Sequence, residues 1–541
     1  MYYSDPMRLV RPPAAGRAAI VFGWLIGLAC FVYLLALPPT LNSADESFIL
    51  YGAKRVYQGQ ALYHDFFDFL TPGSFYLYAL AYAIGGVSIT SARVTTCLLN
   101  ALSAVCVYFL SLQVASAVEA AIAALLVVVI CVPVWNMASH HWIATACALA
   151  SAAVLLAPRW QASERARPLA AGMLGGLLVC THQNRGVWLI LWLVLTVPLL
   201  TLTRRDDRRW RHCVRELVWT ALGGALVCVP VLGFAVWRAS LAELLYATHT
   251  WVLTNYRNYN VGTIRWAGYG FWWAGGLKYT SLRLMQAVPW LLGLEAATLL
   301  WGAWRYGLHA EAPRAALLLL ALSAVAAISY FPDYVHIAFA LPFVLIVLAG
   351  LVYRARTALV AFDRPAARTT MRLVATAAVL LVLWKGWTNV GLAWQANPVL
   401  FETAYGTLAN SAFSAGVVRD LREKLHVDDA APPRIFSYPT DAWLYLAVPA
   451  DNPTPFALLR PVYNTPEQFQ EAIDRLERDP KALVLVNSLF AKADDPFMTY
   501  LNKGWRPIAP IGPGVIYGEP LYHLYERTPS GASSAPSEAH S

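Results

Sequence analysis

Acidic side chains follow the first long apolar segment of the chain. Asp45 and Glu46 come soon after the apolar residues 18–37, and Asp65 lies in a later polar stretch framed by aromatic residues. A carboxylate is costly next to hydrocarbon, so its presence there calls for a reason. One such acid could act as a general base, and a second could orient it or hold a divalent cation. The alternative is that Asp45 only caps the helix that follows it.

Two further polar motifs interrupt apolar stretches. His141 belongs to His140-His141-Trp142, which opens a predicted helix. Paired histidines could bind phosphate or a metal, although histidine beside tryptophan is also common at membrane boundaries. Arg185 ends the stretch Thr181-His182-Gln183-Asn184-Arg185 at the tip of a predicted helical hairpin. Its planar guanidinium could pair with a lipid phosphate, or the stretch could be a simple polar turn.

Aromatic residues are dense between positions 246 and 273, where nine of them surround Arg257 and Arg265. Such rings anchor proteins in the headgroup region, and they also stack on sugars, so an anchor and an isoprenoid groove with either arginine on a phosphate both stay open. Further along, Asp333 and His336 lie between two apolar segments. On chemistry alone, Asp333 could cap the helix that begins after it.

The composition indicates which kind of fold must position these residues. The chain has 541 residues, of which 58% are hydrophobic and 13% charged, against about a quarter charged in soluble domains. Apolar runs long enough to cross a bilayer recur from residue 17 to about 393. The sequence therefore predicts a polytopic α-helical membrane protein with 11 to 13 transmembrane helices and a small C-terminal α/β domain. The formal charge of +9 is typical of basic cytoplasmic loops and does not indicate nucleic-acid binding.

The basic residues predict the topology. Arginines precede the first apolar segment, and four basic loops cover 158–168, 204–215, 305–314 and 354–372. Positive loops stay in the cytoplasm, so all the polar motifs above are expected on the outer side, with the first external loop at 38–72. The first segment has no small-residue cleavage site and is expected to be a retained anchor. Residues 72–134 contain three apolar segments where the charges require an even number of crossings, so one is expected to be re-entrant or interfacial.

The predicted domains are a cytoplasmic N-terminus (1–17), a transmembrane catalytic domain (18–393), an outer α/β domain (394–527) and a disordered tail (528–541). An amphipathic helix is expected over 47–57, and Thr465 with Gln468 predicts a capping box. Strands are expected at 434–438 and 482–486, followed by a hairpin over 515–525. The eight cysteines lie almost entirely in apolar segments, which favours buried thiols over disulfides or metal ligands.

The order of these motifs resembles the GT-C membrane glycosyltransferases. The resemblance rests on one N-terminal helix, Asp45-Glu46, an interfacial helix, the stretch Gly-Gln-Ala-Leu-Tyr-His-Asp-Phe-Phe at 59–67, and Thr-Pro-Gly-Ser-Phe-Tyr-Leu-Tyr at 71–78. It is strongest over 18–200. Within this group the chain is similar to bacterial relatives of protein O-mannosyltransferases and lipid A aminoarabinose transferases, which are glycosyltransferase family 39-like. Those enzymes have a Lys- or His-Pro-Pro-Leu-like element where this chain has Leu70-Thr71-Pro72-Gly73, so the resemblance does not name the sugar.

The resemblance implies an inverting glycosyltransferase that uses a polyprenyl-phosphate sugar on the periplasmic face of a bacterial inner membrane. The acceptor would be a lipid, a polysaccharide or a protein. Asp45 matches the catalytic base of these families, Glu46 matches their second acid, and Asp333 with His336 matches an element that contacts the donor. Rival hypotheses are a transporter or flippase of lipid-linked saccharides and a non-catalytic envelope assembly factor. A transporter would carry its functional charges near the bilayer midplane and would be built from two repeated halves.

Overall fold

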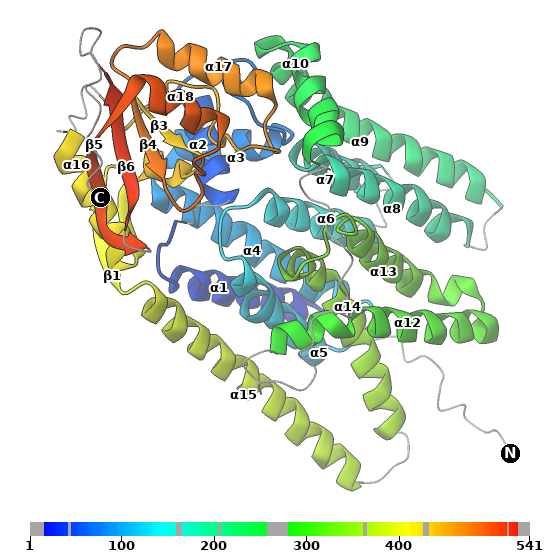
Figure 1. Cartoon of the computed structure of the whole chain (residues 1–541). Helices are drawn as coiled ribbons and strands as arrows, with labels where there is room; N and C mark the ends of the chain where they lie inside the picture. The colour runs from blue at the N-terminus through cyan, green and yellow to red at the C-terminus, as the bar shows by residue number, and fades with distance from the viewer. Residues whose placement is uncertain are drawn as a thin grey trace, which may run out of the picture.

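The computed structural model describes residues 16–41, 45–157, 165–203, 207–256, 280–360, 365–425, 432–516 and 519–528. A large helical body carries a small domain of helices and strands at one end, and α15 (Pro365–Ala396) leads from one to the other (Figure 1). The predicted 1–17 and 528–541 segments lie almost wholly outside the described residues, as do Arg257 and Arg265.

Nine helices among the described residues are long and apolar enough to cross a membrane. Two shorter apolar helices, α6 (His140–Leu156) and α7 (Ala166–Thr181), accompany them, and the total reaches eleven, the low end of the predicted range, only when both are counted as crossing. The nine are α1 (Arg17–Leu35), α4 (Ile89–Ser111), the continuous α5–η1–η2 (Ala117–Val134), α8 (Gln183–Leu202), α9 (Arg209–Arg238), the Leu284–Tyr306 part of α12 (Thr280–Tyr306), α13 (Leu308–Ala326), the Tyr334–Leu359 part of α14 (Tyr334–Val360), and the Thr369–Ala396 part of α15. The chain is therefore a polytopic membrane protein.

The helix α3 (Gly73–Gly85) is the short member of the predicted triplet between 72 and 134. Its 13 residues rise about 20 Å, which is less than the roughly 30 Å of a hydrocarbon core. It packs against α2 (Asp45–Tyr57) on the side of the C-terminal domain. Its length makes α3 the candidate for the expected interfacial or re-entrant segment.

Helices α7 and α9 approach each other most closely through glycines. A Cβ atom built on Gly172 would collide with the Thr220 carbonyl oxygen, and one built on Gly223 would collide with that of Leu169. Small residues at helix contacts let backbones pack tightly in a membrane, where dispersion rather than the hydrophobic effect holds helices together. The α7–α8 hairpin that carries Arg185 therefore has a firm support on α9.

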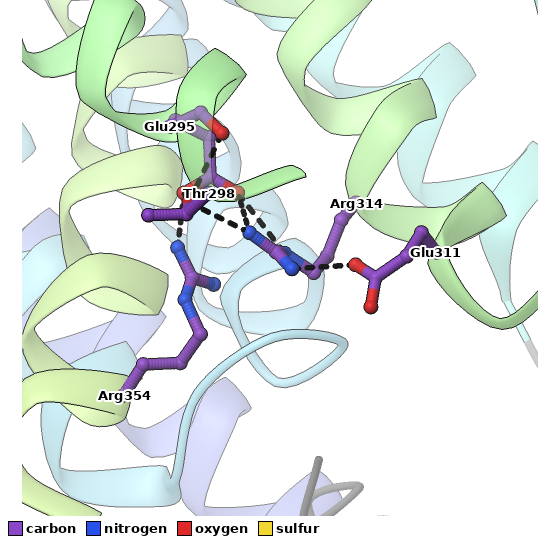
Figure 2. A network of polar contacts seen from close by, with 5 residues as sticks. All are labelled: Glu295, Thr298, Glu311, Arg314 and Arg354. Carbon is purple, nitrogen blue, oxygen red and sulfur yellow. Dashed lines mark hydrogen bonds and ion pairs between the residues drawn. The ribbon is translucent and has the colours of Figure 1, made fainter. Parts of the chain in front are cut away.

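Buried ion pairs join other helices of the body. Glu295 of α12 accepts hydrogen bonds from Arg314 of α13 (3.0 Å) and from Arg354 of α14, and Arg314 also pairs with Glu311 (Figure 2). Both arginines belong to the basic loops that were used to predict the topology. A charge inside a membrane body is tolerated when it is paired, so the network fixes three helices together.

The C-terminal domain contains a two-stranded and a four-stranded sheet, which confirms the predicted α/β class. Antiparallel β1 (Val399–Thr403) and β2 (Gly406–Asn410) precede α16 (Ala412–Leu425). The larger sheet has the order β3-β4-β6-β5, with β3 and β4 parallel and the other pairs antiparallel. Its elements are β3 (Ile435–Tyr438), α17 (Pro466–Glu477), β4 (Leu483–Asn487), α18 (Pro496–Gly504), β5 (Trp505–Ile516) and β6 (Glu519–Arg527). The capping box of Thr465 and Gln468 is present.

This domain covers the helix that carries the first-loop acids. Tyr51 of α2 stacks on Tyr445 of the short 3-10 helix η7 (Ala442–Leu446), with ring centroids 4.4 Å apart. Lys54 donates to the Tyr445 carbonyl oxygen (3.3 Å), and the Phe67 backbone N–H donates to that of Pro455 (3.0 Å). The predicted helix at 47–57 therefore exists, but the C-terminal domain covers much of the polar face that was expected to meet water.

Candidate active site

The structure brings Asp45 next to the distant Asp333–His336 pair. Asp45 is the first residue of α2, and its carboxylate is electrostatically coupled to both His336 and Asp333. Asp333 Oδ1 accepts from the His336 backbone N–H (2.8 Å) and lies 2.7 Å from His336 Nδ1. Asp333 thus caps the start of α14, as its position predicted, and also orients the imidazole of His336, whose charge acts on Asp45.

The surroundings of Asp45 balance opposing effects on its ionisation. Burial raises the pKa of the Asp45 carboxyl above its ordinary value, and the nearby Asp333 adds to that rise. His336 and the Trp135 indole favour the charged form and hold the pKa of Asp45 down. A carboxylate whose pKa is raised binds a proton more strongly than an exposed one, which suits it to accept a proton from an acceptor.

The other two predicted acids of the first loop make different contacts. Glu46 is 1% exposed, pairs with Arg93 (3.2 Å) and accepts from the Ala138 backbone N–H (2.8 Å). Asp65 is exposed and accepts from the Ala61 backbone N–H (2.6 Å), which closes its own turn. Glu46 therefore ties α2 to the segment before α6. Among the described residues, the one group of three or more clustered metal-ligating side chains does not include these acids.

Sequence reasoning did not select Asp68, which the structure places near Asp45. Its Oδ1 accepts from the Leu70 backbone N–H (2.9 Å). Burial raises the pKa of the Asp68 carboxyl to about 7, and the charge of Asp45 adds to the rise. The only signal in the sequence is its place three residues after Asp65 in the same polar stretch. Asp68 therefore supplies a second carboxyl group with a raised pKa near the candidate base.

Arg185 of α8 is 4% exposed, and its guanidinium donates to the carbonyl oxygens of His141 (2.7 Å) and Phe339 (3.4 Å). In the part of the chain that the structure describes, it forms no ion pair with a carboxylate. Tyr330 is electrostatically coupled to both Arg185 and Asp45, so the two lie around one region. A buried cation without an acidic partner is a suitable site for an anionic ligand.

Three histidines cluster beside His336. Ring centroids of His140 and His141 are 4.1 Å apart, and those of His141 and His182 are 4.8 Å apart. The His141 ring is also 5.0 Å from that of His336. The sequence had indicated His140-His141 and the 181–185 stretch separately, and only the tertiary fold unites them.

The described part of the aromatic segment packs between the first loop and the C-terminal domain. Trp251 is fully buried and lies against Phe67, Phe69 and Tyr463. A cavity of about 260 Å³ opens beside Phe67, and Glu243, Glu467 and Glu471 are among its lining residues. The first loop, residues 243–247 and the C-terminal domain thus line one cavity next to the stretch that carries Asp68.

No family model matches the sequence, and no curated protein is similar enough to count as a relative. Solved structures do match. Superposed on ArnT from Cupriavidus metallidurans bound to undecaprenyl phosphate, the chain has a TM-score of 0.57, with 15% identity over 96% of this chain and 100% of that one. The chain has the GT-C fold. AglB from Archaeoglobus fulgidus, solved with an inhibitory peptide and a dolichol-phosphate, shares the GT-C fold at a TM-score of 0.51 and 14% identity. The match covers 90% of this chain and 73% of AglB. The mycobacterial arabinofuranosyltransferase AftD matches at 0.51 and 15% identity, over 96% of this chain and 40% of its own.

Proposed function

We propose that the protein is a GT-C glycosyltransferase that moves a sugar from a polyprenyl-phosphate donor to an acceptor at the periplasmic face of a bacterial inner membrane. The observation that carries the proposal is the Asp45 carboxylate, on which the charges of the Asp333–His336 pair act, in one region with the Arg185 guanidinium, which has no carboxylate partner among the described residues. A base, an oriented imidazole and an anion site in one region are what a displacement at a sugar phosphate requires.

The reaction would be a single displacement. Asp45 takes a proton from the acceptor hydroxyl or amine, and the freed electron pair forms a bond to the anomeric carbon. The bond from that carbon to the phosphate oxygen breaks, and polyprenyl phosphate leaves with the electron pair. Because attack and departure occur on opposite faces, the anomeric configuration is inverted.

The remaining residues take supporting roles in this proposal. Arg185 binds the donor phosphate through its planar guanidinium, and its two backbone contacts hold it in place. His336 and Asp333 contact the donor, while Glu46 positions α2 through Arg93. Asp65, Arg257 and Arg265 stay predicted contacts of the donor or its lipid.

The neighbours support a lipid-phosphate donor. The ArnT structure holds undecaprenyl phosphate, and the AglB structure holds a dolichol-phosphate together with an inhibitory peptide. At about 15% identity the likeness carries the fold, so the chemistry of the donor rests on Arg185 and Asp45 in this chain. The acceptor is a lipid, a polysaccharide or a protein.

The test is transfer of radiolabelled sugar from a panel of polyprenyl-phosphate donors in membranes that contain equal amounts of wild type or Asp45→Asn. We expect the wild type to transfer label from one donor and Asp45→Asn to lose about 100-fold or more of the rate. Asp494→Asn, an exposed change in the C-terminal domain, is the matched control and should keep the full rate. Equal rates in wild type and Asp45→Asn would remove Asp45 as the base. No transfer from any donor would favour a transporter of lipid-linked saccharides.

A further inference from the structure

We propose that His140, His141 and His182 bind a transition-metal ion of the zinc type. One ring nitrogen from each histidine lies within 4.8 Å of the corresponding atoms of the other two. Among the described residues this is the one group of three or more metal-ligating side chains with such proximity. The proposal concerns a site next to the proposed catalytic groups and does not depend on the transferase assignment.

Burial makes the cluster unusual. The three histidines are 8%, 4% and 6% exposed, in the order His140, His141 and His182. The Nδ1 atoms of all three and the Nε2 atom of His182 have no hydrogen-bond partner among the described residues. Buried polar atoms almost always have a partner, so four such nitrogens in one place point to a shared ligand. A metal ion would satisfy three of them at once.

The fold holds the three rings on firm supports. His140 and His141 open α6, where Ser139 Oγ accepts from the His141 backbone N–H (3.2 Å). The His141 ring also stacks on Phe339 of α14, with centroids 4.5 Å apart and planes at 14°. His182 is the single residue between α7 and α8. Ligands fixed at helix ends need little reorganisation to bind a metal.

Ligand chemistry selects the kind of metal. Three neutral imidazoles suit Zn²⁺, Co²⁺, Ni²⁺ or Cu²⁺, whereas Mg²⁺ and Ca²⁺ prefer oxygen ligands. Zinc–nitrogen bonds of about 2.0–2.1 Å in a tetrahedron place the nitrogens roughly 3.3 Å apart. Binding an ion would require the ring nitrogens, which lie within 4.8 Å of one another, to move closer to that value. Three protein ligands leave a fourth position for water or for an oxygen of a substrate.

A divalent ion adds positive charge to the cluster, so the charges nearby must balance it. Arg185, which donates to the His141 carbonyl oxygen, opposes a second positive charge. Asp333 binds His336, whose ring is 5.0 Å from that of His141, and Asp45 lies beside the same His336. These two carboxylates offset the added charge. The alternative is a packed group of neutral imidazoles with no ion.

The test uses full-length protein purified in detergent with a tag that contains no histidine, stripped with a chelator and then given one equivalent of Zn²⁺ or Co²⁺. We expect about one Zn²⁺ per chain after desalting and a visible Co²⁺ absorption of the tetrahedral kind. His182→Ala should weaken Zn²⁺ binding by about 100-fold or more, beyond the 10–100-fold that loss of an outer partner costs. His249→Gln, an exposed histidine outside the cluster, should bind as the wild type does.

His182→Cys keeps the proposal testable if His182→Ala does not fold. A cysteine at this position should retain Co²⁺ and add a sulfur charge-transfer band, which appears only when residue 182 is a direct ligand. The proposal is overturned if the stripped wild type takes up neither ion, or if His182→Ala retains Zn²⁺ at the wild-type affinity. A zinc site in a protein that transfers no sugar would leave this inference standing and refute only the proposed function.

Discussion

The buried network around Glu295 allows a quantitative test of how the helical body is held together. The side chains of Glu295, Arg314 and Arg354 are 5%, 10% and 20% exposed. Glu295→Gln preserves the shape of the side chain but removes the carboxylate that both arginines share. Removing one partner of a buried ion pair costs about 3–5 kcal/mol, because the remaining charge is left uncompensated. Unfolding entropy scales with length, so for 541 residues this loss lowers Tm by about 3–4 °C.

The assay is thermal unfolding of detergent-purified protein at one fixed scan rate. The control is Glu526→Gln, which breaks the ion pair with Arg506 whose side chains are 35% and 58% exposed. Such a surface pair contributes at most about 1 kcal/mol, so Tm should fall by about 1 °C or less. Adding Arg354→Gln to Glu295→Gln leaves the Arg314–Glu311 pair balanced and should recover part of the loss. The reasoning fails if Glu295→Gln lowers Tm no more than Glu526→Gln does.

Three further predictions concern the candidate site. His336 holds the pKa of Asp45 down, so His336→Gln should raise that pKa and move the acidic limb of transfer activity to higher pH in a pH profile; an unchanged limb would contradict the effect of His336 on Asp45. Tyr445→Leu removes the stack on Tyr51 and should lower the transfer rate. Tyr51→Leu introduced into the Tyr445→Leu variant should lower the rate less than Tyr51→Leu does alone, with a coupling of about 0.5–1.5 kcal/mol in a double-mutant cycle of rates. Strict additivity would refute the contact as a support of α2. Arg185→Lys keeps the charge but not the planar fork, so KM for the donor should rise about tenfold, and a change in kcat alone would argue against phosphate binding.

The helical body and the C-terminal elements could be predicted from sequence because their signals are local. Apolar runs of sufficient length predict spans, and Thr465 with Gln468 predicts a capping box within four residues. The position of Asp333 before a helix gave its capping role in the same way. Each of these features depends on neighbours in the chain, which a sequence displays directly.

The assembly of the candidate site could be predicted only in part. The outer-side motifs were expected to gather, and Asp45, Asp333 and His336 do. The sequence contains no signal that His182 joins His140, because that contact depends on how the α7–α8 hairpin packs against α6. The glutamate partners of the basic-loop arginines were missed for the same reason: an ion pair between α12 and α14 is a property of helix packing.

The cover that η7 places on α2 also has a consequence for biosynthesis. Lys54 and the Tyr445 carbonyl oxygen that it binds are 391 residues apart in the chain. A ribosome therefore completes the whole helical body before Tyr445, which lies 49 residues after the last residue of α15 (445 − 396), can contact α2. Chains that stop short, or whose last domain fails to fold, would insert normally yet lack the support of the Asp45 helix. Maturation of the site is thereby delayed to the last stage of synthesis, so incomplete chains in the membrane would be inactive.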